Sequence, residues 1–168
     1  MKTFSKLTIA LLAFFFCKTS NAQMDSSSEL YRTVQDLDSI LFINGFNNCM
    51  LQEMDPYIAK DLEFYHDQSG ISTSKEEFFE AINQNICSNR DKKPIRKLVK
   101  GSMEVFPLYN NGVLYGAIQK GVHQFYIRES DKEPYLTSTA KFTHVFTMQD
   151  NLWQLKRVLS YDHHSPQH

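Results

Sequence analysis

The chain lacks the short motifs by which nucleotide sites and activated serines are usually recognised. It has six glycines in 168 residues, and none of them forms a phosphate-cradling loop or a dinucleotide-binding fingerprint. It also contains no strand-to-helix turn of the Gly-x-Ser-x-Gly type, which excludes the nucleophile elbow of α/β-hydrolases. Nucleotide-dependent chemistry is therefore not expected, and no cofactor is predicted.

An excess of charge of either sign is missing as well. The 18 lysines and arginines nearly balance the 19 acidic residues, for a formal net charge of −1. Residues 1–22 carry three of the lysines and no acid, so a chain that begins at residue 23 has a formal charge of −4. A mildly acidic protein has no electrostatic reason to bind DNA or RNA.

Long hydrophobic runs are absent except for one of about ten residues, Leu7 to Phe16. Two lysines precede this run, and the small residues of Ser20-Asn21-Ala22 follow it, as in a secretory signal peptide. A bilayer requires about 20 apolar residues, so a membrane anchor is disfavoured. We predict that residues 1–22 are a signal peptide cleaved near Ala22, and that the protein is periplasmic or secreted without further contact with a membrane.

Cysteine is scarce. Cys17 lies in the predicted signal peptide, where it suggests a lipoprotein alternative that the bulky Phe16 before it disfavours. The mature chain keeps Cys49 and Cys87, whose spacing is not that of a zinc site. In an exported protein two cysteines favour a disulfide worth roughly 3–4 kcal/mol. Two separate buried thiols are the alternative.

The first half of the chain is predicted to be helical around one strand. Residues 23–28 are a short polar leader, and Ser26 with Glu29 matches a capping box for a helix over 29–44. A second, short helix is expected over residues 50–59, interrupted by Pro56. The segment 61–67 alternates as a strand does, and a third helix is expected from about Ser74.

The second half is predicted to consist of long strands. These cover residues 95–108, 113–128 and the two arms of a hairpin over 137–161, with turns at Asn110-Asn111-Gly112 and at Gln149-Asp150-Asn151. Gly116 and Gly121 are expected at bulges or bends of the strand. Helices first and strands afterwards indicate an α+β domain over residues 29–162, followed by a flexible tail, 163–168.

Alternation along these strands assigns side chains to the inner face of the sheet. His66 shares its face with Leu62 and Phe64, and His123 shares its face with Gln119 and Phe125. In the hairpin the inward set is Ala140, Phe142, His144, Phe146 and Met148 on one arm, and Trp153, Leu155, Arg157, Leu159 and Tyr161 on the other. Asp67 lies on the opposite face from His66 unless the strand bulges. The predicted ligand-binding residues are Tyr31, Phe64, His123, Phe142, Phe146, Met148, Trp153 and Arg157.

At this level of detail the sequence resembles the nuclear transport factor 2-like superfamily, in particular its SnoaL-like and ketosteroid-isomerase-like members. The resemblance rests on the first helix, on residues 59–67 leading into Gly70, and on the closing strand, Asn151 to Ser160. It implies a cone of three helices packed in a strongly curved, mostly antiparallel sheet. It also implies a homodimer formed through the outer face of the sheet.

The resemblance carries over to individual positions in part. The family's proton-shuttling carboxylate at the end of the first strand falls on His66 or Asp67, and its second inward acid falls on His144. Its inward tyrosine on the first helix corresponds weakly to Tyr31. Because both acids are replaced by histidine, the steroid-isomerase mechanism does not transfer.

Three functions remain open from the sequence. The favoured one is an apolar cavity that binds a small hydrophobic molecule. The second is an isomerase, dehydratase or hydrolase in which His66 abstracts a proton and His144 donates one. The third is a structural or partner-binding homodimer. The simpler alternative to the catalytic function is that His66 and His144 are only buried and hydrogen-bonded. A metal site made by His66, His123 and His144 lacks any fixed ligand spacing, and no metal is predicted.

Overall fold

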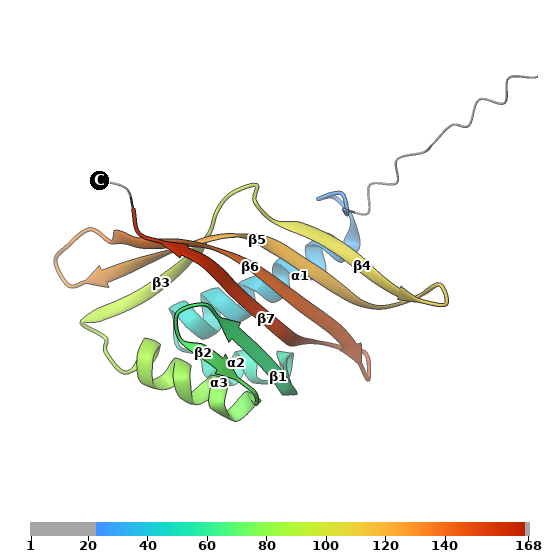
Figure 1. The fold of residues 1–168 in the computed structure, drawn as a ribbon, viewed down its shortest axis with the longest axis horizontal. Coiled ribbons are helices and arrows are strands. Elements are labelled where there is room, and N and C mark those ends of the chain that lie inside the picture. The colour runs from blue at the N-terminus through green and yellow to red at the C-terminus, as the bar shows by residue number, and fades with distance from the viewer. Residues whose placement is uncertain (1–22, 167–168) are drawn as a thin grey trace, which may run out of the picture.

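Helices cover one face of a single curved sheet, as the ribbon shows (Figure 1). The computed structural model describes residues 23–166. The predicted signal peptide, with Cys17 and the Ala22 cleavage site, lies outside the described residues, as do residues 167–168. The two-layer arrangement of helices against a sheet confirms the predicted α+β fold.

Three helical segments provide the first layer. They are α1 (Glu29–Asp38) with a π-helical continuation (Ser39–Asn47), α2 (Leu51–Met54) with a 3-10 turn (Asp55–Tyr57), and α3 (Lys75–Ile82) with a π-helical continuation (Asn83–Cys87). Ser74 caps α3 as predicted, since its hydroxyl accepts from the Glu77 amide. The cap of α1 is Ser28 and not Ser26, because the Ser28 hydroxyl accepts from the Tyr31 amide.

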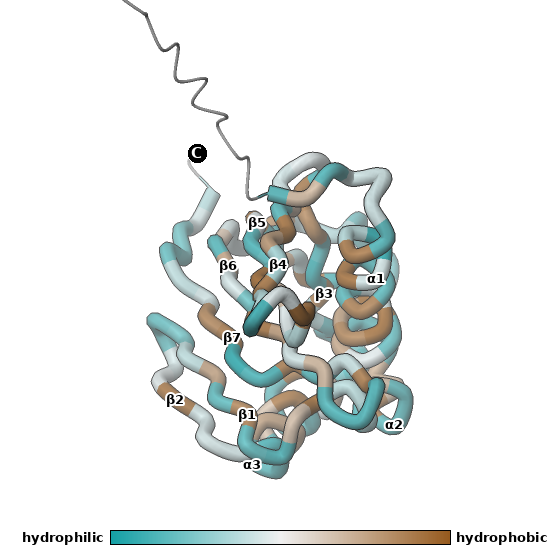
Figure 2. The backbone as a smooth tube through the Cα atoms, turned by 90° about the vertical axis from the view of Figure 1, so that its right-hand side faces the viewer, coloured by the Kyte–Doolittle hydropathy of each residue, from teal (hydrophilic) through white to brown (hydrophobic). Residues whose placement is uncertain are grey.

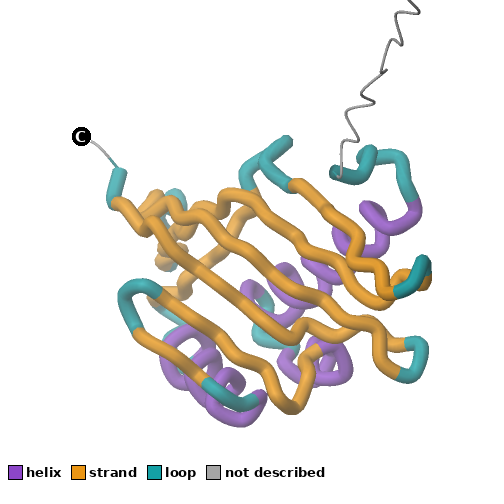
Figure 3. The backbone as a smooth tube through the Cα atoms, turned by 45° about the vertical axis from the view of Figure 1, so that its right-hand side comes forward, coloured by secondary structure: helices purple, strands orange, loops and turns teal. Residues whose placement is uncertain are grey.

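Seven strands form the second layer. They are β1 (Ile58–His66), β2 (Gly70–Ser72), β3 (Lys92–Leu98), β4 (Glu104–Asn110), β5 (Val113–Glu129), β6 (Tyr135–Gln149) and β7 (Leu152–His164). The order across the sheet is β2-β1-β7-β6-β5-β3, with β4 also beside β5, and the strands lie side by side in Figure 3. All pairs are antiparallel except β1 with β7, which is parallel. The sequence did not predict β2.

Two predicted elements have different limits in the structure. The second helix ends before Ile58, because Ile58 and Ala59 already belong to β1. The single strand expected over residues 95–108 is interrupted at Gly101, whose φ of 79° turns the chain between β3 and β4. Both halves still pair with β5, one along each part of its length.

The two glycines of β5, Gly116 and Gly121, have different structural roles. At Gly116 the pairing with β4 shifts register, as expected for a bulge. Gly121 keeps regular register with Phe142 on β6, so of the two expected alternatives there is no bulge at this glycine. A Cβ at residue 121 would lie 2.8 Å from the Phe142 ring, and glycine therefore allows that ring to lie against the strand.

Strand β7 bulges twice, and each bulge changes which side chains face inward. Register with β6 shifts across Lys156 and again across Asp162, which has a φ of 62°. Val158 and Ser160 are consequently buried, whereas Leu159 is 38% exposed. The predicted inward row of β7 is therefore wrong beyond Leu155, and the strand continues to His164, past the predicted end of the domain at residue 162.

The core lies between the two layers. Val34, Leu37 and Leu41 project from α1 and its continuation onto Leu62, Phe146 and Leu155 of the sheet, all at most 4% exposed. Hydrophobic segments of the helices and strands face each other across this space in Figure 2. Cys49 and Cys87 form the predicted disulfide, with their Cα atoms 5.9 Å apart. Among the described residues, none of the helices has the length and apolar character needed to span a bilayer.

Candidate functional site

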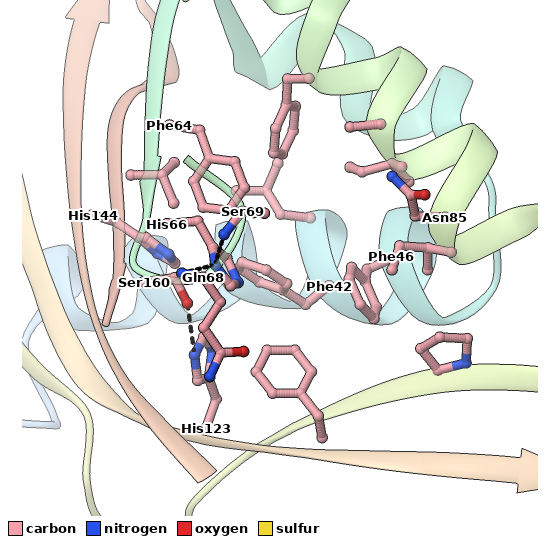
Figure 4. Close-up of a pocket in the computed structure, with 18 of the residues that line it drawn as sticks. Phe42, Phe46, Phe64, His66, Gln68, Ser69, Asn85, His123, His144 and Ser160 are labelled. Atoms are coloured by element: carbon pink, nitrogen blue, oxygen red, sulfur yellow. Dashed lines mark hydrogen bonds between the residues drawn. The ribbon is translucent and has the colours of Figure 1, made fainter. Parts of the chain in front are cut away.

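A cavity of about 440 Å³ lies between the concave face of the sheet and the helices. The helices supply an apolar wall, which includes Leu41, Phe42, Phe46, Phe78, Ile82 and Ile86. The strands supply a wall that carries polar groups, namely His66, His123, His144, Ser160 and His163. Figure 4 shows the labelled histidines and Ser160 gathered on one side, with Phe46 and Asn85 on the other. The volume is that of a site for a small organic molecule.

Four of the predicted site residues line this cavity, and they are His66, His144, His123 and Phe64. Asp67 does not line it but lies beside His66. Phe142 and Phe146 are fully buried in the layer behind the lining, where the Phe142 ring contacts the rings of both His123 and His144.

The remaining predicted residues lie elsewhere. Tyr31 and Trp153 pack against the edge of the core, and Met148 is 37% exposed near the end of its strand. The Arg157 side chain forms an ion pair with Glu63 at 2.9 Å on the outer side. The bulge at Lys156 explains this last placement, because it turns Arg157 away from the cavity.

His144 is held by a buried polar chain that starts at an ion pair. Arg96 donates two hydrogen bonds to the Asp38 carboxylate, at 2.6 and 3.0 Å. The Gln119 amide donates to the same carboxylate at 3.0 Å, which leaves its carbonyl oxygen to accept from His144 Nδ1 at 2.8 Å. The proton of His144 is thereby fixed on Nδ1, so Nε2 presents a lone pair.

Burial keeps His144 neutral. Desolvation first, and then the positive charge of Arg96, lower the pKa of His144 well below its ordinary value. The Phe42 ring stacks on the imidazole, with ring centres 5.4 Å apart, and the Arg96 guanidinium carbon lies 4.0 Å from the centre of the same Phe42 ring. His144 can therefore accept a hydrogen bond readily, but it takes up a proton with difficulty.

His66 has the opposite arrangement of donor and acceptor nitrogens to His144. Its Nδ1 accepts from the backbone amides of Gln68 and Ser69, at 3.1 and 3.2 Å, in the turn that follows β1. The ring proton therefore lies on Nε2, which is a donor. Desolvation, with a smaller contribution from His163, lowers the pKa of His66. The predicted assignment of His66 as base and His144 as donor is thus the reverse of what these hydrogen bonds favour.

Asp67 and His163 form a dyad that the sequence did not predict. The Asp67 carboxylate accepts from the His163 ring Nδ1 at 2.5 Å and from the His163 backbone amide at 3.1 Å. Desolvation acts to raise the pKa of Asp67, but the hydrogen bonds from His163 outweigh it, and the pKa is lowered. The His163 side chain is only 4% exposed, so the prediction that it belongs to a flexible tail is wrong.

Ser160 lies between two imidazoles. Its Oγ is 3.3 Å from His123 Nε2 and 3.5 Å from His163 Nε2. Desolvation first, and then the charge of Arg96, lower the pKa of His123 to about 3. Among the described residues, His123 Nδ1 is one of two buried side-chain nitrogens without a hydrogen-bond partner.

One group of side chains has the composition of a metal site. His66, Asp67 and His163 offer ligand atoms that lie within 4.8 Å of one another, which differs from the His66, His123 and His144 set considered from the sequence. In the present arrangement one nitrogen of each imidazole is already engaged: His66 Nδ1 accepts from two backbone amides, and His163 Nδ1 donates to Asp67. The group is therefore better described as a hydrogen-bonded cluster than as a preformed ligand set.

Comparisons with known proteins agree with this architecture. The sequence matches no protein-family model and no curated protein sequence. Among solved structures it is similar to ActVI-ORFA from Streptomyces coelicolor, with a TM-score of 0.65, 12% identity, and coverage of 80% of this chain and 97% of that one.

Two further solved structures are similar to the chain. An NTF2-like protein from Cytophaga hutchinsonii has a TM-score of 0.60 at 12% identity, over 79% of this chain and 98% of that one. LinA has a TM-score of 0.60 at 14% identity, over 81% and 88%. Together with the curved mixed sheet, the three helices and the cavity between them, these similarities confirm that the chain has the nuclear transport factor 2-like fold.

Proposed function

We propose that the domain binds a small, largely apolar molecule in the cavity between helices and sheet. The observation that carries the proposal is the division of the lining into a mainly aromatic and aliphatic wall, which includes one polar side chain, Asn85, and a wall with a few fixed polar groups. Apolar contact supplies affinity in such a site, and the polar groups set orientation and specificity.

The hydrogen bonds specify the ligand further. His66 Nε2 is a donor and suits a carbonyl oxygen, whereas His144 Nε2 is an acceptor and suits a hydroxyl. Both rings are held neutral by burial, which favours recognition of uncharged groups over binding of an anion. We therefore expect an uncharged compound that carries a carbonyl or hydroxyl group on an apolar frame.

Acid–base catalysis by His66 and His144 is the second candidate. The two rings have complementary donor and acceptor atoms in one cavity, which supports it. The low basicity of buried His144 argues against proton abstraction, so we place binding first. An unchanged ligand after prolonged incubation with the protein, analysed by mass spectrometry, is the outcome expected for a binding module.

The test is a thermal-shift screen of the chain from residue 23 with uncharged carbonyl and hydroxy compounds. A ligand at 100 times its Kd stabilises the folded state by about 2.7 kcal/mol, which raises the melting temperature. Ala81 lines the cavity, so Ala81→Phe should abolish the shift by filling the space. Glu76→Phe, on the exposed side of the same helix, is the matched control. A shift that survives Ala81→Phe would contradict the proposal.

We also propose export, with cleavage near Ala22. The disulfide between Cys49 and Cys87 supports it, because such bonds persist in oxidising compartments. Expression of the whole chain followed by N-terminal sequencing of the fractionated product tests the idea. A cytosolic product that keeps residue 1 would contradict it.

A further inference from the structure

We propose that Ser160, His163 and Asp67 form a nucleophilic relay that hydrolyses a small apolar ester bound in the cavity. The proposal rests on the proposed function, since the cavity must first admit the ester. It adds a covalent step at Ser160 and His163, two groups of the polar wall whose hydrogen bonds were not used above to define the ligand.

The directions of the hydrogen bonds orient the three side chains as a relay. A carboxylate only accepts, so the 2.5 Å contact from Asp67 fixes the proton of neutral His163 on Nδ1. His163 Nε2 then carries a lone pair on the side of Ser160 Oγ, 3.5 Å away. This is the arrangement in which an imidazole, oriented by an acid, removes the proton of a serine.

His123 completes the orientation of the hydroxyl. Ser160 has one proton to donate, and His123 Nε2 lies 3.3 Å from the same oxygen. When the Ser160 hydroxyl donates to His163, His123 must donate its Nε2 proton to Oγ. Because the pKa of His123 is about 3, the ring stays neutral and does not compete for the serine proton.

The geometry is that of a resting site. A separation of 3.5 Å is longer than a formed O–H···N hydrogen bond, and such contacts are often looser before a substrate binds. Ser160 and His163 both line the cavity, so a bound ester would meet Oγ directly. His66 is stacked on His163 with ring centres 4.4 Å apart, and its Nε2–H provides a donor on the same wall for the developing oxyanion.

The chemistry balances with water as the only co-reactant. Ser160 Oγ forms a bond to the ester carbonyl carbon as its proton passes to His163 Nε2. The carbon–oxygen bond to the alcohol breaks, and the alcohol leaves with that proton. Water then attacks the acyl-serine, its proton passes through His163 back to Ser160 Oγ, and the carboxylic acid is released. Asp67 touches no substrate in this scheme and acts as a positioning residue for His163.

The experiment combines covalent labelling with a binding measurement. The folded chain from residue 23 is treated with a small alkyl fluorophosphonate and mapped by peptide mass spectrometry, and hydrolysis of p-nitrophenyl butyrate is followed in parallel. We expect the label on Ser160 in the folded protein and not in heat-unfolded protein. Ser160→Ala should remove both the label at this position and the hydrolysis above buffer.

Variants of the relay separate catalysis from structure. His163→Gln should slow labelling by about 100-fold or more, as for loss of a general base, while the exposed neighbour His164→Gln should match the wild type. Asp67→Asn should slow labelling, with partial recovery in Asp67→Glu. Binding of N-phenyl-1-naphthylamine, an uncharged fluorescent probe, should be retained in Asp67→Asn, because Asp67 does not line the cavity. Loss of probe binding in Asp67→Asn would show that Asp67 is needed for the structure of the site and not only to position His163.

The outcomes distinguish the two proposals. Probe binding without any label on Ser160 overturns the relay and leaves the binding function in place. Labelling of Ser160 at the same rate in His163→Gln also overturns the relay, because the hydroxyl would then react without its base. Absence of both probe binding and label overturns the relay together with the proposed function.

Discussion

Arg96 carries a positive charge into the layer beneath the cavity, where its residue is only 3% exposed. The charge is balanced by Asp38 and lies over the rings of Phe42 and Phe142, at 4.0 and 5.1 Å. It also disfavours protonation of His123 and His144. One arginine therefore helps to set the donor and acceptor pattern of the polar wall.

Removing the negative charge of Asp38, the partner of Arg96, should lower the stability of the folded protein. Asp38→Asn takes away the negative charge and leaves Arg96 buried and uncompensated, for which we expect a loss of about 3–5 kcal/mol in the free energy of unfolding. Urea denaturation measures the loss. Asp36→Asn, on the exposed side of the same helix, should change stability by less than about 0.5 kcal/mol. A loss below about 1 kcal/mol in Asp38→Asn would show that the pair is not required.

The buried histidines make stability depend on pH. The folded protein holds His123 and His144 neutral, whereas the unfolded chain protonates them below pH of about 6.5. The unfolded state then binds more protons, so this stability is present in full above about pH 6.5 and is lost as the pH falls towards 3. Each histidine contributes a slope of about 1.4 kcal/mol per pH unit.

Urea denaturation at several pH values between 7 and 4 measures that slope. His123→Asn should lower the slope of stability against pH by about 1.4 kcal/mol per pH unit, because one fewer proton is taken up on unfolding. His164→Gln, a change at an exposed histidine, is the matched control. An equal slope in wild type and His123→Asn would contradict the assignment of a neutral, buried His123.

At the scale of elements, the disulfide joins the ends of two helical segments that line the cavity. Cys49 follows the continuation of α1, Cys87 ends the continuation of α3, and the two are 38 residues apart in sequence. We expect Cys49→Ala/Cys87→Ala to lower the free energy of unfolding by about 4 kcal/mol, since the unfolded chain regains the freedom of that loop.

Reduction provides the control for this prediction. Treatment of the wild type with a reducing agent should lower its stability by a similar amount, and the same agent should not affect the double variant. A double variant as stable as the oxidised wild type would contradict the prediction.

Alternation predicted the strands well where pairing is regular and failed where it is not. The inward placement of His66, His123 and His144 followed from period two, because β1, β5 and β6 keep one parity near these residues. Strand β7 carries apolar residues on both faces, such as Val158 and Leu159, so alternation alone could not reveal the extra residue at Lys156. Ser160 was consequently assigned to the outer face.

His163 was missed for a related reason. Asp162 adopts a left-handed conformation with a φ of 62°, which lets the chain bulge and turn His163 inward. Aspartate tolerates that conformation better than most residues, and this was the only local signal available. The partner of His163, Asp67, is distant in sequence, so the dyad could not be seen without the parallel pairing of β1 with β7.

At the scale of the whole molecule, an apolar row crosses the outer face of the sheet. Tyr65 on β1 pairs with Ile71 on β2 and with Leu159 on β7, and their exposed fractions are 43%, 56% and 38%. Since contiguous exposed apolar side chains often mark interfaces, we propose that a second copy of the chain covers this row.

Sedimentation velocity tests the proposed dimer. Leu159→Lys places a charge within the row and should yield monomers at concentrations where the wild type is dimeric. Val113→Lys changes another exposed residue, 68% exposed and close to the β4–β5 turn, and should leave the dimer intact. A wild type that sediments as a monomer at every concentration would contradict the proposal.

The position of β7 between β1 and β6 has a consequence for synthesis. A ribosome makes β1 in the first half of the domain and β7 at its end, so β1 cannot reach its parallel partner until nearly the whole domain has been translated. During that interval β1 has only the short strand β2 beside it, so Leu62 and Phe64 are not yet covered and can promote aggregation. The cavity is completed only by the last strand, which supplies Ser160 and His163 and joins β1 to the rest of the sheet.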